Sequence, residues 1–180
     1  MHLQFAISPS EAKRARWPHE IFLINLIFNH IFVFVASVSV ARTFPLMPLL
    51  SPVISLCIIS YIMIKSKQVL ANEESWFVKA HWIICARRNH LFIILLLVPC
   101  VVTAAGLWLS RMLLWSKIQT IALIGGIGLL PFMVALLILI ILGNESVHLA
   151  RFGKLPKSFL NQHPEISDQS IHSATLTGIK

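Results

Sequence analysis

Long runs of apolar residues divide the chain into four parts. Residues 21–41 contain no Asp, Glu, Lys or Arg, and three similar runs cover residues 47–64, 91–109 and 118–142. A helix of roughly 20 apolar residues is long enough to cross the roughly 30 Å hydrocarbon layer of a membrane. The pattern therefore predicts four membrane-spanning segments.

The same runs favour helices over strands. A membrane β-barrel alternates apolar and polar residues in segments of about ten, because one side of each strand faces the lumen. The four runs are instead apolar on every face, and a helix satisfies its backbone hydrogen bonds by itself inside lipid. We expect an all-α polytopic membrane protein, with a bundle of four transmembrane helices in residues 21–150.

Composition excludes two other classes of protein. Hydrophobic residues make up 57% of the 180-residue chain, charged residues only 12%, and the mean hydropathy is +0.80. An ordinary soluble domain is about one-quarter charged. The chain is therefore too apolar for a soluble globular domain and too apolar to stay disordered in water.

The distribution of positive charge predicts the orientation. With the N-terminus inside, twelve Lys and Arg residues lie on the inner side, and only Arg42, Arg111 and Lys117 lie outside. Such a bias follows the positive-inside rule. We expect a multi-pass protein of the cell inner (plasma) membrane with both termini in the cytoplasm. The net charge of +8 then needs no nucleic-acid partner.

Basic and aromatic residues gather at the expected inner boundary. Cations there attract anionic lipid headgroups, and tryptophan rings prefer the same layer. The expected headgroup contacts are Lys13, Arg14, Arg16, Arg87, Arg88, Trp76 and Trp82. The bilayer, with anionic headgroups on the cytoplasmic side, is therefore an expected partner.

Short segments flank the spans. Residues 1–20 form a basic cytoplasmic segment, where a capping box at Ser8 starts a short helix that we expect to break near Pro18. Asn72, followed by two glutamates, predicts the N-cap of a cytoplasmic interfacial helix before the third span, or of a helix that runs straight into it. We expect the polar cytoplasmic tail, residues 151–180, to be mobile.

The first span has a processing alternative. It follows a basic segment and ends in the small residues Ser39-Val40-Ala41, which suit a signal peptidase. The length of the run and its buried polar residues favour a retained span. A cleaved protein would have three spans and would begin outside.

Polar residues inside the first span are candidate contact or pathway residues. Asn25 and Asn29 share a helix face with Ser39, while His30 and Ser37 lie on a second stripe. Burying a side-chain amide in hydrocarbon without a hydrogen-bond partner costs several kcal/mol of free energy. These groups therefore predict hydrogen bonds between helices or a polar path for a substrate or ion.

Small residues in the third and fourth spans predict close helix packing. Gly106 and Ser110 have the small-xxx-small spacing, and so do Ala122 and Gly126. Gly125 and Gly128 add to the same apolar stretch. We interpret all six residues as helix-packing positions.

Candidate cofactor sites are incomplete. His30 with His90 could hold a haem between two spans, and His81 with Cys85, four residues apart, could share a metal. Two ligands do not make a metal site, and none of the seven acidic residues lies in a span. We expect no catalytic residue, no resident cofactor and no metal.

Three functional hypotheses follow. The first is a non-enzymatic accessory or assembly subunit that binds other membrane proteins, or a second copy of itself, through the first and fourth spans. The second is a transporter or channel subunit with a polar path at Asn25, Asn29 and His30. The third is a small haem-binding membrane redox protein.

Overall fold

The computed structural model describes residues 2–44 and 46–164, and within them four long apolar helices are each able to cross a membrane. The protein is a multi-pass membrane protein with four transmembrane helices. The first consists of α1 (Pro9–Ile24), η1 (Asn25–Val33) and α2 (Phe34–Ser39), the second of η2 (Met47–Leu49) and α3 (Leu50–Ala71), the third is α4 (Trp76–Met112), and the fourth consists of α5 (Lys117–Leu123), η3 (Ile124–Leu129) and α6 (Leu130–Arg151).

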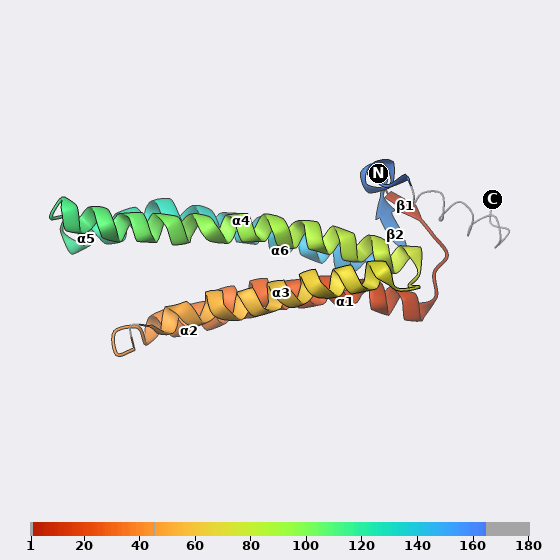
Figure 1. The fold of residues 1–180 in the computed structure, drawn as a ribbon, viewed down its shortest axis with the longest axis horizontal. Helices are drawn as coiled ribbons and strands as arrows, with labels where there is room; N and C mark the ends of the chain where they lie inside the picture. Colours follow the sequence, from red (N-terminus) through yellow and green to blue (C-terminus); the bar gives the residue numbers. More distant parts are fainter. Residues whose placement is uncertain (1, 45, 165–180) are drawn as a thin grey trace.

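The four helices form two hairpins. Figure 1 shows the first and second helices side by side, the third and fourth side by side, and the N-terminus at one end of the molecule. We call this end the terminal end, and the opposite end, with the turns after α2 and α4, the loop end. The hairpins pack on each other through α1 with α4 and α6, and through α3 with α4. Toward the loop end they draw apart (Figure 1).

The first helix continues where the sequence predicted a break. Ser8 caps α1, with its hydroxyl accepting from the Glu11 amide at 3.2 Å and the Glu11 carboxylate accepting from the Ser8 amide at 2.9 Å. The helix then runs through Pro18. A helix in contact with neighbours tolerates the proline, because packing compensates for the lost backbone bond. Pro18 and His19 are both buried.

The third helix begins close to the end of the second and has no separate interfacial part. Ser75, not Asn72, is its N-cap, and its hydroxyl accepts from the Val78 amide. From Trp76 the helix continues without a break for 37 residues, or about 55 Å at 1.5 Å per residue. The structure thus has the second of the two predicted alternatives, since no Pro or Gly interrupts residues 76–90.

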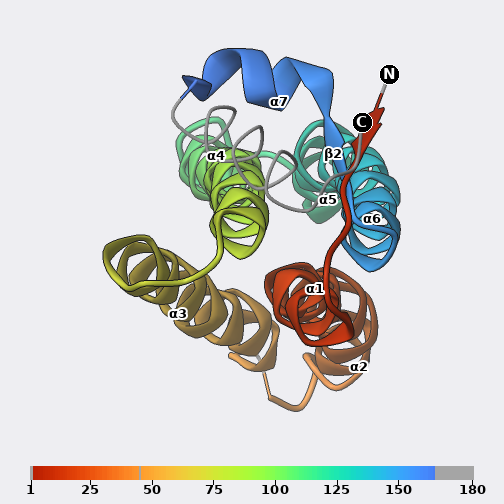
Figure 2. The same cartoon turned by 90° about the vertical axis from the view of Figure 1, so that its right-hand side faces the viewer.

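Part of the tail is folded, which differs from the expected mobile segment. The strands β1 (His2–Gln4) and β2 (Lys154–Pro156) pair antiparallel, with Leu3 opposite Leu155. The short helix α7 (Lys157–Gln162) follows and lies across the terminal end (Figure 2). Leu155, Phe159 and Leu160 are buried, and their burial holds this segment. The expectation for residues 165–180 lies outside the described residues.

Two core clusters lie in the terminal half. One joins Ala15, Phe77 and Ala80 to the folded tail. The other joins all four helices and consists of Phe22, Leu26, Ile59, Ile62, Cys85, Phe92, Phe132, Leu136 and Leu139. The loop half contributes few buried residues, so most of the packing between the hairpins lies nearer the chain ends.

Candidate functional site

A chain of hydrogen bonds joins η1 to α3. The Asn25 amide donates to the Ser55 hydroxyl at 3.0 Å, and the Asn29 amide donates to the Ser51 carbonyl at 2.9 Å and to the Asn25 side-chain oxygen at 3.0 Å. The Ser51 hydroxyl donates back to the Asn29 carbonyl at 3.2 Å. All four side chains are buried. We call this set the amide seam.

The π-helical segment η1 carries polar groups on two sides. A π-helix has more residues per turn than an α-helix and commonly occurs at functional positions. Asn25 and Asn29 face α3, whereas the His30 ring packs on Phe92 of α4 and Phe132 of α6, with centroids 5.0 and 5.9 Å away. One turn of helix therefore contacts both hairpins.

His30 is only half satisfied. Its Nδ1 lies 3.1 Å from the Asn25 carbonyl oxygen, which can only accept, so Nδ1 carries the proton in this bond. Nε2 is then an acceptor, and it is buried without a hydrogen-bond partner among the described residues. Buried polar atoms of this kind commonly bind water.

More polar residues continue from the amide seam toward the terminal end. The Asn89 amide of α4 donates to the Ile59 carbonyl of α3 at 3.3 Å. Closer to the terminal end, His19 Nε2 and His81 Nδ1 lie 3.1 Å apart, and the Cys85 thiol donates to the Pro18 carbonyl at 3.2 Å. We call Asn89, His19 and His81 the histidine–asparagine column.

Of this column only His81 was a predicted candidate, as a possible metal ligand with Cys85, and its contacts with other helices were not predicted. Phe77, His81, Cys85 and Asn89 follow one another at intervals of four and are all buried, so they share one helix face. That periodicity was visible in the sequence. It was missed because residues 65–90 were placed outside the bundle, where their contacts with other helices were not considered.

The remaining polar residues of the first span bond within their own helix. The Ser37 hydroxyl donates to the Phe34 carbonyl at 2.7 Å, and the Ser39 hydroxyl donates to the Val35 carbonyl at 2.9 Å. Ser37 is buried and Ser39 is exposed. Neither joins the amide seam.

The small residues fall into two groups. An added Cβ at Gly106 would lie 3.1 Å from Ile124, and one at Gly128 would lie 3.1 Å from Val102, so both glycines bring α4 and η3 together. At Gly125 and Gly126 an added Cβ would meet nothing within 4 Å. Ser110 is half-buried and Ala122 is exposed. We call Ala122, Gly125 and Gly126 the open small-residue face.

The expected headgroup residues also differ in their surroundings. Lys13 is exposed, Arg14 pairs with Glu74 at 2.7 Å and Arg16 with Glu20 at 3.6 Å. The Arg87 side chain donates to Gln162 at 2.6 Å, and Arg88 donates to the Leu142 carbonyl and the Ser146 hydroxyl. Trp82 is only 3% exposed, and Trp76 packs on Phe5 with centroids 4.9 Å apart. Arg88 and Trp82 therefore act inside the helix bundle.

Neither candidate ligand pair, His30 with His90 or His81 with Cys85, is part of a complete cofactor or metal site among the described residues. His81 turns to His19 and Cys85 to Pro18, and residues 2–44 and 46–164 contain no group of three metal-binding side chains. His30 faces Phe92, whereas His90, two positions earlier on α4, is exposed. Residues two apart point in nearly opposite directions on a helix, so α4 does not bring His90 to His30.

No protein-family model, curated protein or solved structure matches this chain. The site is therefore interpreted from its own chemistry.

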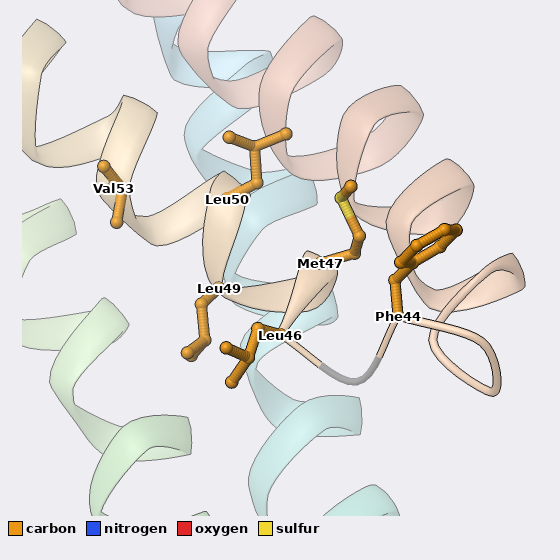
Figure 3. A pocket seen from close by; sticks show the side chains of 6 residues that line it. All are labelled: Phe44, Leu46, Met47, Leu49, Leu50 and Val53. Carbon is orange, nitrogen blue, oxygen red and sulfur yellow. The ribbon is translucent and has the colours of Figure 1, made fainter.

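The loop end carries an apolar pocket. It has a volume of about 490 Å³ and is lined by Phe44, Leu46, Met47, Leu49, Leu50 and Val53. Figure 3 shows that these side chains come from the loop after α2, from η2 and from the start of α3. Only apolar side chains line it, so it has no group for acid–base or nucleophilic chemistry.

Proposed function

We propose that the protein is a non-enzymatic accessory or assembly subunit that binds a transmembrane helix of another membrane protein. The open small-residue face carries this proposal. Small residues let two helix backbones approach closely, and such faces are typical of helix–helix interfaces in membranes. Gly106 and Gly128 serve this purpose inside the second hairpin, whereas Gly125 and Gly126 have open space in front of them.

The first helix offers the second part of the proposed contact surface. Phe28, Phe32 and Val35 are exposed, and α2 packs mainly on its own hairpin. The first and fourth helices pack together through α1 and α6 and draw apart toward the loop end (Figure 1). This geometry supports binding of a partner helix along the loop half of either helix.

The amide seam supports a structural role for the buried amides. Three of its hydrogen bonds cross from η1 to α3. They engage the side-chain amide nitrogens of both Asn25 and Asn29. We therefore assign Asn25 and Asn29 to holding the first hairpin together, and assign no catalytic residue.

Photo-crosslinking tests the partner proposal. A benzoylphenylalanine at Gly126 should cross-link to one other membrane protein in native membranes, and the additional change Ala122→Leu should abolish that product. The same probe at Leu137, an exposed position on α6, is the control and should give no protein product. Equal products from both positions, or none from Gly126, would contradict the proposal. A product of twice the protein's mass would replace the partner by a second copy.

The proposal includes the orientation, with both termini in the cytoplasm of a cell with an inner (plasma) membrane and with anionic headgroups around the terminal end. The charge distribution supports it. A membrane-impermeant maleimide should label Phe44→Cys, but not Lys13→Cys, from outside intact cells. The reverse labelling pattern would contradict this orientation.

A transporter or channel subunit is the second candidate, favoured by a separate observation. His30 Nε2, Asn29 Oδ1, Asn89 Oδ1 and His19 Nδ1 are buried and lack hydrogen-bond partners among the described residues. These atoms lie along the amide seam and the histidine–asparagine column. Water or a polar solute there would supply the missing hydrogen bonds. Under this candidate, Asn29→Leu abolishes a flux without lowering the amount of folded protein. An unchanged flux counts against it.

A further inference from the structure

A pocket with a positive charge lies at the terminal end of the first hairpin. It has a volume of about 460 Å³ and is formed by α1, α3 and the start of α4 with the preceding turn; Figure 2 shows these elements around one another. Its lining includes Lys13, Arg14 and Trp17 of α1 and Lys65 of α3. It also includes Glu74, in the turn before α4, and Trp82 of α4. Three helices therefore contribute to a single site.

The pocket has more cations than acids. Glu74 is engaged by Arg14, with 2.7 Å between Nη1 and Oε2. Among the described residues, no carboxylate lies within salt-bridge distance of Lys13 or Lys65. Lys65 Nζ has a 3.4 Å contact with the side-chain oxygen of Gln68, which is long for a hydrogen bond. Two ammonium groups from different helices thus remain available for an anion.

The depth of the pocket matches the headgroup layer. Lys65 directly follows the apolar run of the second helix, and Trp17 lies four residues before the apolar run of the first. Tryptophan rings concentrate at this boundary. Trp17 is half exposed, while Trp82 is nearly buried beside it in the same lining.

An apolar surface continues from the pocket toward the membrane centre. Tyr61 lies one turn below Lys65, and Ile24 lies two turns below Trp17. Both are exposed. A molecule with an anionic head and an apolar chain therefore fits this place better than a free anion does.

We propose that this pocket binds the headgroup of one anionic phospholipid, with the phosphate between Lys13 and Lys65 and an acyl chain along α1 and α3. Basic pockets between transmembrane helices bind acidic headgroups in this way. The inference rests on the four membrane-spanning helices and is independent of the proposed protein partner. Lys13, Arg14 and Lys65 thereby act as a defined site, beyond the general attraction of a basic surface.

Native mass spectrometry of the full-length protein in detergent micelles tests the site. The probe is dioctanoyl phosphatidylglycerol, with dioctanoyl phosphatidylcholine and inorganic phosphate in separate titrations. We expect one phosphatidylglycerol to bind in preference to phosphatidylcholine. The double variant Lys13→Gln/Lys65→Gln should weaken phosphatidylglycerol binding about tenfold to thirtyfold, because each cation near the headgroup contributes about fivefold to the affinity.

The matched control removes two cations from the same end of the molecule. Lys67 and Lys79 do not line the pocket, so Lys67→Gln/Lys79→Gln should change the affinity by less than about twofold, since exposed charges act weakly at a distance. Equal weakening in both double variants would show diffuse attraction and overturn the site. Equal binding of phosphatidylcholine, or displacement of the lipid by millimolar inorganic phosphate, would also overturn it. Size-exclusion chromatography of each variant confirms that the protein stays folded.

Discussion

The terminal half and the loop half of the molecule are packed by different means. In the terminal half, large side chains from all four helices meet in one cluster, and the folded tail covers a second. In the loop half, each hairpin is closed by its own contacts, through Ser51 in one and through Gly106 and Gly128 in the other. Large buried side chains thus join the two hairpins at the terminal end only. At the loop end the helix surfaces stay free for lipid or a partner.

Two phenylalanines of the first helix give the largest expected contrast. Phe22 is fully buried and its ring centroid lies 6.0 Å from that of Phe92, whereas Phe32 is 62% exposed. Phe22→Ala leaves a cavity between the hairpins and should lower the free energy of unfolding by about 3 kcal/mol. Phe32→Ala should lower it by less than about 0.5 kcal/mol, as at most surface positions.

Unfolding in mixed micelles of dodecyl maltoside and sodium dodecyl sulfate measures both variants. Similar losses for the two would contradict a core confined to the terminal half.

Two glycines of η3 provide the next contrast. At Gly128 an added side chain meets the β-branched Val102 and the backbone of Pro99, whereas Gly126 faces open space. Gly128→Leu should therefore cost about 1–3 kcal/mol of unfolding free energy through overpacking. Gly126→Leu should leave this free energy unchanged or raise it slightly, because leucine is the better helix former. If Gly126→Leu destabilises the isolated protein as much as Gly128→Leu, the small-residue face is internal.

The amide seam has the smallest expected effect. Asn25→Leu removes one bond to Ser55 and one from Asn29. Each such bond in a membrane contributes about 0.6 kcal/mol, so the free energy of unfolding should fall by about 1 kcal/mol. Ser39→Ala, which removes only a bond within its own helix, is the control and should have almost no effect. Equal effects would indicate that the seam does not join η1 to α3.

Much of the fold could be predicted from the apolar runs alone. Three of the four predicted spans lie inside one long helix of the structure, and the first, residues 21–41, extends two residues past the end of its helix at Ser39. Length and composition suffice for that inference. The ends of the helices were harder. The helix α1 continues past Pro18 because it packs on neighbouring helices. The start of the tail is folded because Phe159 is buried, although the tail is polar on average. Both effects depend on contacts between segments distant in sequence.

The candidate site could be predicted only in part. Asn25, Asn29 and His30 were identified because polar groups in an apolar run are costly. Their partners were not, since hydrogen bonds from Asn25 to Ser55 depend on the register between two helices. The two polar faces of η1 followed from helical spacing, but its π-helical backbone was not predicted, because the sequence has no clear pattern for it.

The central claim is that the hairpins are joined at the terminal end and separate toward the loop end. Electron–electron double resonance between spin labels on the first and fourth helices tests it in a lipid bilayer, with Cys57 and Cys100 replaced by serine. One label pair takes the positions of Glu20 and Glu145, near the tight contact between Leu23 and Gly143, and the other takes those of Val38 and Ile121. We predict a short, narrow distance distribution for the first pair and a longer, broader one for the second. Short, narrow distributions for both pairs would describe a closed four-helix bundle and would contradict the account.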